Sequence, residues 1–237
     1  MLCAISIAAA LAPVTARAEA TTDVNLSIPT PDGPLVTSGG FYETGPYAGL
    51  VFDGSFPVGS SIVDDPGFFA EIGTLPYSAT PPFFGVRFDF VKQLLYWNGS
   101  TLAAPSVSLT VSEATRTVTI SGTDTAGKPG ILIANIPSNG GYHVHPDFTL
   151  GSGAPDGLYG MVMTLGPNGS TTGFTTSEPI LIALLKGNFP NYGDGIAAMA
   201  AVAFVPEPAA AWPAAVGLAL VAARRLRRRN FCCNPVA

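Results

Sequence analysis

Residues 106–122 read SVSLTVSEATRTVTISG, and this stretch decides the fold class. Apolar residues alternate with serine and threonine before the polar segment 113–115, and the alternation resumes after it. The alternating apolar residues are Val107, Leu109, Val111, Val118 and Ile120. A two-residue period places successive side chains on opposite faces of a strand, and the stiff χ1 of Val and Thr suits a pleated surface. The sequence therefore predicts a β-hairpin.

Similar short apolar runs continue in both directions and are closed by Gly, Pro, Asn or Asp. In the stretch 82–99, PFFGVRFDFVKQLLYWNG, the side chains of Phe84, Val86, Phe88 and Phe90 are predicted to share one face of a strand. An α/β fold requires helical patterns between strands, and none occurs before residue 190. We therefore expect residues 21–190 to form one all-β domain, an antiparallel β-sandwich or a jelly-roll-like barrel.

The segment 191–205 is expected to be a short helix or a last strand, followed by a linker. Its alanine-rich centre suits a helix, and Ile196, Met199 and Val202 are spaced three residues apart. This spacing favours a helix with one apolar stripe.

Composition excludes some classes of function. Residues 21–205 carry five Lys and Arg against fourteen Asp and Glu, a formal charge of −9. So few cations make few phosphate contacts, which argues against nucleic acid as a partner. Cys3, Cys232 and Cys233 are the three cysteines, so the domain between them has neither a disulfide nor a cysteine metal site.

Residues 1–20, MLCAISIAAALAPVTARAEA, are expected to be a signal peptide. They contain an apolar core from Leu2 to Val14, and both Ala16-Arg17-Ala18 and Ala18-Glu19-Ala20 fit a cleavage site flanked by small residues. The alternative is a buried N-terminal helix. The sequence favours export.

At the other end of the chain, residues 209–223 carry no charge and precede a cluster of arginines. A helix of this length spans about 22 Å, and arginines that reach back to the interface extend that span. By the positive-inside rule the arginines stay in the cytoplasm. We expect a hydrophobic transmembrane helix that anchors the protein in the inner membrane.

The order of these C-terminal features resembles the PEP-CTERM sorting signal of Gram-negative exosortase systems. The residues that carry the resemblance are Pro206, Glu207, Pro208, Arg224, Arg225, Arg227, Arg228 and Arg229. The resemblance implies an exosortase-type processing protease as a partner, cleavage near Pro-Glu-Pro, and delivery to the cell surface or extracellular matrix with exopolysaccharide as a further partner. Residues 230–237 form a tail beyond the signal, and residues 64–188 resemble uncharacterised ectodomains of PEP-CTERM proteins.

The sequence contains two histidines, and both lie in the segment Gly141-Tyr-His-Val-His-Pro-Asp147. Residues i and i+2 of a strand share a face, so His143 and His145 are expected to point the same way, with Asp147 following them. Two imidazoles and a carboxylate suit zinc, and after it copper. The alternative is an exposed strand with two ordinary histidines.

Two other sets of residues are weaker candidates. Asp64-Asp65-Pro66-Gly67 and Asp32-Gly33 are either calcium-binding turns or plain turns. The second set consists of aromatic residues, which are expected either to stack against a glycan or to pack in the core. These residues are Phe83, Phe84, Tyr96, Trp97 and Tyr142.

The sequence shows no nucleophile elbow, phosphate-binding loop or metalloprotease helix. We therefore expect an exported, exosortase-sorted surface or matrix protein without catalytic activity. The alternative is a surface module that binds a metal ion or a glycan.

Overall fold

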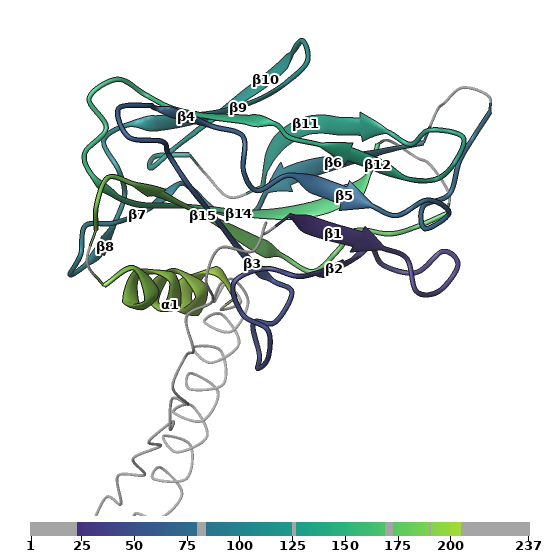
Figure 1. Ribbon diagram of the computed structural model, residues 1–237, viewed down its shortest axis with the longest axis horizontal. Helices are drawn as coiled ribbons and strands as arrows, with labels where there is room; N and C mark the ends of the chain where they lie inside the picture. Colours follow the sequence, from purple (N-terminus) through teal and green to yellow (C-terminus); the bar gives the residue numbers. More distant parts are fainter. Residues whose placement is uncertain (1–22, 80–83, 125–126, 169–172, 190, 205–237) are drawn as a thin grey trace, which may run out of the picture. The chain divides into compact units, whose positions relative to one another are not determined.

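The computed structural model describes residues 23–79, 84–124, 127–168, 173–189 and 191–204 (Figure 1). The predicted signal peptide, the predicted sorting signal with its transmembrane helix, and the tail lie outside these residues. In the part of the chain that is described, no helix has both the length and the apolar character needed to cross a membrane.

Fifteen strands and one helix are present within the described residues. The strands are β1 (Val24–Ser27), β2 (Val36–Ser38), β3 (Val51–Ser55), β4 (Ile62–Val63), β5 (Phe68–Ala70), β6 (Gly85–Phe90), β7 (Leu95–Trp97), β8 (Leu102–Ala103), β9 (Ser108–Glu113), β10 (Arg116–Ser121), β11 (Lys128–Asn135), β12 (Tyr142–Val144), β13 (Asp147–Leu150), β14 (Gly157–Pro167) and β15 (Ile180–Lys186). The helix is α1 (Tyr192–Ala203). The all-β prediction is confirmed.

The strands form three sheets. The N-terminal sheet has the order β12-β5-β1-β2, and the hairpin sheet has the order β10-β9-β13-β4. The seven-stranded sheet has the order β11-β6-β14-β15-β3, with β7 paired to β14 and β8 paired to β7. Two pairs are parallel, β1 with β5 and β15 with β3, so the expectation of a purely antiparallel domain is wrong. In both pairs long connecting segments separate the partners in sequence, which allows the crossover that parallel pairing needs.

The predicted hairpin is confirmed as β9 and β10, paired antiparallel from Glu113 opposite Arg116 to Ser108 opposite Ser121. Ala114 lies in the turn and has a φ of 52°, in the left-handed region that a tight reversal uses. Leu109, Val111 and Ile120 are fully buried, whereas the serines and threonines between them are not. The two-residue period therefore corresponds to one buried face and one more exposed face of this hairpin.

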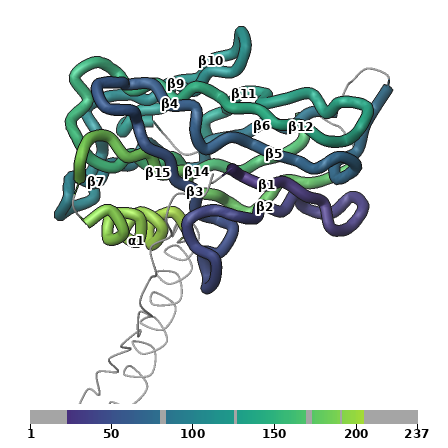
Figure 2. The backbone as a smooth tube through the Cα atoms, in the orientation of Figure 1, coloured from purple at the N-terminus to yellow at the C-terminus, as the bar shows by residue number. Residues whose placement is uncertain are grey.

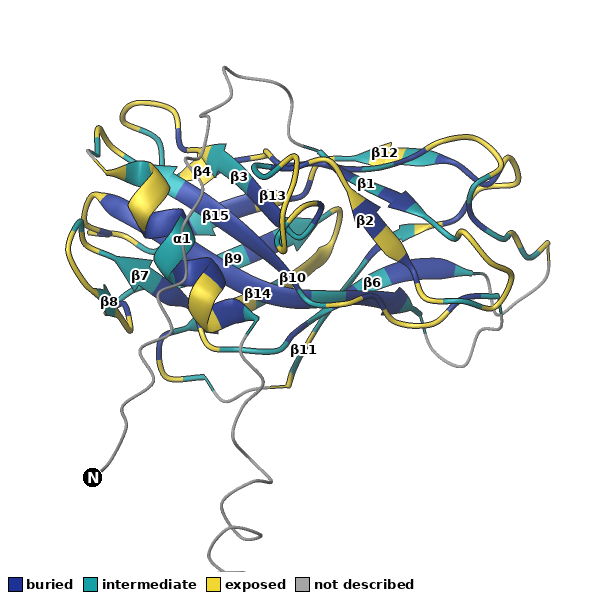
Figure 3. Cartoon of the chain, turned by 90° about the horizontal axis from the view of Figure 1, so that it is seen from below, coloured by how far each residue is buried: buried dark blue, intermediate teal, exposed yellow. Residues whose placement is uncertain are grey.

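The central strands of the seven-stranded sheet, β14 and β15, are buried on both faces, and Figure 3 shows them largely in the colour of buried residues. In β14, Tyr159, Met161 and Met163 belong to the main core, which the sheet shares with the two smaller sheets. The intervening Leu158 and Val162 belong to a second apolar cluster with α1. This two-sided burial explains why the β14 sequence is apolar almost throughout.

Helix α1 covers the face of β14 and β15 that is turned away from the smaller sheets (Figure 1). Its buried residues include Ile196, Met199, Ala200 and Ala203, which are spaced at i, i+3, i+4 and i+7. The prediction of a helix is confirmed, but Val202 is not part of the buried stripe and is 40% exposed. Position i+6 falls outside that stripe on a helix of 3.6 residues per turn.

A half-buried acid, Asp53, joins α1 to the sheet. The Tyr192 hydroxyl, in the first turn of α1, donates a hydrogen bond of 2.6 Å to Oδ2 of Asp53 on β3. Burial raises the pKa of the Asp53 carboxyl, and the bond from Tyr192 opposes this only in part. Burial, with the nearby Asp53 charge, also raises the pKa of Tyr192.

Candidate metal centre

The N-terminal sheet brings together segments that are far apart in the chain. Strand β5 lies between β1 and β12, with Asn25 opposite Phe69 on one side and His143 opposite Phe69 on the other. Figure 2 shows these three strands side by side. Asp23 directly precedes β1 and His145 directly follows β12, so both reach the same end of the sheet as Gly67, which precedes β5.

Three side chains converge at this end of the sheet. His143 Nε2 lies 2.9 Å from Asp23 Oδ2 and 2.9 Å from His145 Nε2. One ligand atom from each of the three residues lies within 4.8 Å of the other two. The Asp23 side chain is 17% exposed and that of His143 is 50% exposed, so the cluster is anchored in the protein and open to solvent.

Hydrogen bonds fix the tautomer of His145. Its Nδ1 lies 2.9 Å from the carbonyl oxygen of Asp64, which can only accept, so Nδ1–H is the donor. In the neutral ring Nε2 then carries a lone pair. The Nε2–H of His143 therefore points to two acceptors, Asp23 Oδ2 and His145 Nε2. These two atoms and His143 Nε2 share that one proton, and all three are able to bind a metal ion.

The carboxylate of Asp23 is also held in place. Its Oδ1 accepts a hydrogen bond of 2.9 Å from the backbone N–H of Gly67, which leaves Oδ2 directed to His143. A Cβ added at Gly67 would lie 2.8 Å from His145 Nε2 and 2.9 Å from Asp23 Oδ1. Glycine is therefore required here by the close approach of the backbone to both side chains.

The prediction that His143 and His145 point the same way agrees with the contact between their Nε2 atoms. Asp147, the expected third ligand, is placed elsewhere: it begins β13 and pairs with Ser112 of the hairpin sheet. Strand β12 ends before Pro146, so the two-residue period does not extend to Asp147. The third ligand atom of the cluster comes instead from Asp23, which the sequence analysis did not identify.

The spacing of the cluster fits a transition-metal ion. Metal–nitrogen bonds of about 2.0–2.1 Å place two ligand atoms roughly 2.9 Å apart at right angles and roughly 3.4 Å apart in a tetrahedron. The two 2.9 Å contacts of His143 Nε2 are within a few tenths of an ångström of the tetrahedral spacing, and the ligand atoms of Asp23 and His145 lie within 4.8 Å of each other. Two imidazoles and one carboxylate suit zinc and copper.

The segment 64–67, which the sequence analysis considers as a calcium-binding turn, contacts the ligand cluster through His145. Asp64 supplies the carbonyl oxygen that accepts from His145, and Asp65 Oδ1 lies 3.3 Å from the same Nδ1. Partners of this kind orient metal-binding imidazoles. The segment thus supports a site with nitrogen ligands, which calcium disfavours. Asp32, in the other turn, has a φ of 58° and is exposed.

The aromatic residues that were considered for glycan stacking are divided among different parts of the fold. Trp97, on β7, packs in the cluster with α1, and the Tyr96 hydroxyl donates to the Asp156 carbonyl oxygen. Tyr142 lies on β12 and its hydroxyl is buried, while Phe84 packs against the main core. Phe83 lies outside the described residues. Within the described residues these side chains do not assemble into one stacking surface.

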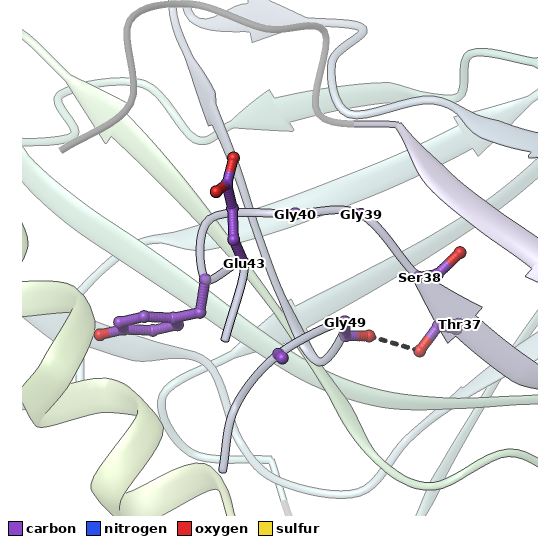
Figure 4. Close-up of a pocket in the computed structure, with 8 residues that line it drawn as sticks. Thr37, Ser38, Gly39, Gly40, Glu43 and Gly49 are labelled. Atoms are coloured by element: carbon purple, nitrogen blue, oxygen red, sulfur yellow. Dashed lines mark hydrogen bonds between the residues drawn. The ribbon is translucent and has the colours of Figure 1, made fainter. Parts of the chain in front are cut away.

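Two recesses are present near the N-terminal sheet. One, of about 380 Å³, is lined mainly by glycines and small side chains, and Figure 4 shows the Thr37 hydroxyl donating to the Gly49 carbonyl oxygen in its wall. The other, of about 570 Å³, is lined by residues that include Phe69 and Tyr142. Phe69 also packs edge-on against His143, with ring centroids 5.5 Å apart. The other residues that line this recess, among them Glu71, lie toward the Ala70 end of β5, away from the Gly67 end where the ligand cluster lies.

Comparisons with known proteins add no assignment. No protein-family model, curated protein or solved structure matches the chain.

Proposed function

We propose that this is an exported surface or extracellular-matrix protein whose β domain binds one divalent transition-metal ion, zinc before copper, through Asp23, His143 and His145. The observation that carries the proposal is the convergence of one oxygen and two nitrogen ligand atoms within 4.8 Å. The role is binding rather than catalysis. The aromatic side chains considered for glycan stacking lie in different parts of the fold, so they support a glycan-binding surface less well than the ligand cluster supports a metal site.

We infer that the domain is a sandwich, in which the two smaller sheets pack on one face of the seven-stranded sheet. The shared core supports this arrangement, because it draws buried side chains from all three sheets. Such a domain presents the ends of its strands to the surroundings, which is where the ligand cluster lies. A rigid support of this kind keeps ligand atoms in position without an ion.

The destination is inferred from the two ends of the sequence. The signal-peptide pattern and the PEP-CTERM-like segment support export, temporary anchoring in the inner membrane, processing by an exosortase-type protease, and release to the surface or matrix, where exopolysaccharide is the proposed neighbour. The intact mass of the protein isolated from its own host tests this route. We expect the loss of about 20 N-terminal residues and of the residues after Pro-Glu-Pro. A mass equal to the full chain would contradict the proposed processing.

Metal analysis tests the binding function directly. The full chain, purified in a non-ionic detergent, is loaded with zinc, dialysed and analysed for bound metal. We expect one zinc ion per chain, and none in the double variant His143→Ala, His145→Ala. The matched control is Asp32→Asn, an exposed acidic turn residue outside the cluster, which should keep its zinc. The metal function fails if the unmodified chain holds neither zinc nor copper above background.

A further inference from the structure

We propose that the metal ion at Asp23, His143 and His145 keeps one coordination position for a carboxylate group of an external ligand. This inference rests on the proposed metal-binding function and names the chemical class that the site takes. Its basis is the number of ligand atoms, the direction in which the cluster is open, and the charge around it.

The cluster supplies three ligand atoms. A zinc ion that is bound by three protein ligands takes its fourth ligand from water or from another molecule, whereas a structural zinc ion has four protein ligands. Among the described residues, the cluster that could hold an ion consists of Asp23, His143 and His145. The domain contains no cysteine that would add a fourth.

Asp65 is the nearest further carboxylate, and its position excludes it as the fourth ligand. Its Oδ1 lies 3.3 Å from Nδ1 of His145, on the ring edge away from the Nε2 atom that faces the cluster. Nδ1 also donates to the Asp64 carbonyl oxygen. The imidazole ring therefore separates Asp65 from the metal position, and Asp65 acts on the site through its charge and through the orientation of the ring.

Asp23 contributes a single oxygen, because its Oδ1 is already bonded to the N–H of Gly67. The two histidines form the open side of the cluster: the His143 side chain is 50% exposed and that of His145 is 35% exposed. Gly67, on the inner side, has no side chain that would cover the ligand atoms. An external group thus reaches the ion from the solvent side.

Charge selects the class of ligand. A divalent ion with one carboxylate and two neutral imidazoles carries a net charge of +1, which a monocarboxylate neutralises. A dianion would leave a net negative charge near the Asp65 carboxylate, which lies 3.3 Å from Nδ1 of His145 and repels a dianion more strongly than a monoanion.

Cobalt provides the test, because a Co²⁺ ion in a site of this kind reports its coordination through visible absorption. The full chain is loaded with Co²⁺ in a buffer free of carboxylates, and acetate, galacturonate, polygalacturonate and sulfate are added in turn. We expect acetate and galacturonate to change the spectrum saturably, and sulfate to bind at least tenfold more weakly. If polygalacturonate binds more tightly per carboxylate group than galacturonate does, the external carboxylate belongs to an acidic polymer. If the two bind equally, it belongs to a free organic acid.

The variant Asp65→Asn removes a negative charge and leaves the three ligand residues in place. It should bind Co²⁺ more weakly, because the partner that orients the His145 ring loses its charge. At Co²⁺ concentrations that fill the site, it should narrow the difference between acetate and sulfate. A chain that binds Co²⁺ with a spectrum that no carboxylate changes overturns this inference and leaves the proposed function standing. A chain that binds neither Co²⁺ nor Zn²⁺ overturns both.

Discussion

Asp23 and His143 are 120 residues apart in the chain, and their side chains meet at 2.9 Å. The contact exists because β5 pairs in parallel with β1 and antiparallel with β12. A carboxylate that directly precedes one strand is thereby placed beside an imidazole on the second strand along. The predictions below begin from this contact.

Removing the Asp23 carboxylate should weaken metal binding. We expect Asp23→Asn to lower the affinity for zinc by roughly tenfold or more, because the amide supplies no negative charge to the ion. Asp147→Asn is the matched control, since this acid lies on β13 outside the cluster. Calorimetric titration of both variants with zinc measures the effect. Equal loss of affinity in the two variants would show that general charge, and not this ligand, binds the ion.

A methyl group at position 67 should disturb the cluster. The Cβ of Gly67→Ala would lie 2.7 Å from Cε1 of His145 and 2.9 Å from Asp23 Oδ1, so both side chains must move. We expect zinc affinity to fall by roughly tenfold, as for the loss of an orienting partner. Gly151→Ala is the control, because its Cβ would have no neighbour nearer than 3.4 Å. Unchanged zinc binding in Gly67→Ala would show that the ligand atoms do not need their present positions.

The half-buried acid Asp53 should make stability depend on pH. Burial raises its pKa in the folded state, so its favourable contribution is complete below the pKa of the unfolded chain and is lost as pH rises through the folded pKa. The free energy of unfolding should therefore fall, relative to that of Asp53→Asn, as the pH rises from about 4, the pKa of the unfolded chain, through the raised pKa of the folded state. Chemical unfolding of both proteins across this range measures the difference. A difference that stays constant with pH would mean that Asp53 titrates as in the unfolded chain.

Two glycines of α1 should respond in opposite ways to alanine. A Cβ at Gly195 would lie 2.6 Å from Cδ1 of Trp97, so Gly195→Ala should destabilise the fold by about 1–2 kcal/mol despite the better helix propensity of alanine. A Cβ at Gly193 would have no neighbour within 4 Å, so Gly193→Ala should stabilise it by about 0.5 kcal/mol. Unfolding midpoints of the two variants test the pair. The packing of α1 on Trp97 would be refuted if Gly195→Ala were the more stable variant.

The β9–β10 hairpin and the all-β fold class were predictable because both depend on local sequence patterns. The alternation at Leu109 and Val111 corresponds to burial on one face of one sheet, and the alternation at Val86, Phe88 and Phe90 does the same in β6. The partners of the strands were not predictable. Parallel pairing of β15 with β3 depends on how distant segments pack, and no local pattern of Leu181 or Val51 records it.

The candidate site was predictable in part for the same reason. His143 and His145 are two residues apart, so the strand period sufficed to place them together. Asp23 lies in a segment of ordinary strand composition, and its position beside them depends on β5. Asp147 was the natural choice from spacing alone, but the strand ends before Pro146 and the chain passes to another sheet.

The parallel pair of β15 and β3 has a consequence for how the chain folds. Among the described strands, β3 has β15 as its only neighbour in the seven-stranded sheet, and the two are separated by most of the domain. Structures dominated by such distant pairings have a high contact order and fold slowly. A nascent chain that ends before Ile180 leaves β3 unpaired, leaves β14 without its neighbour β15, and exposes the face of β14 that packs against α1. Folding is therefore a late event that needs nearly the whole domain, and shorter chains should aggregate.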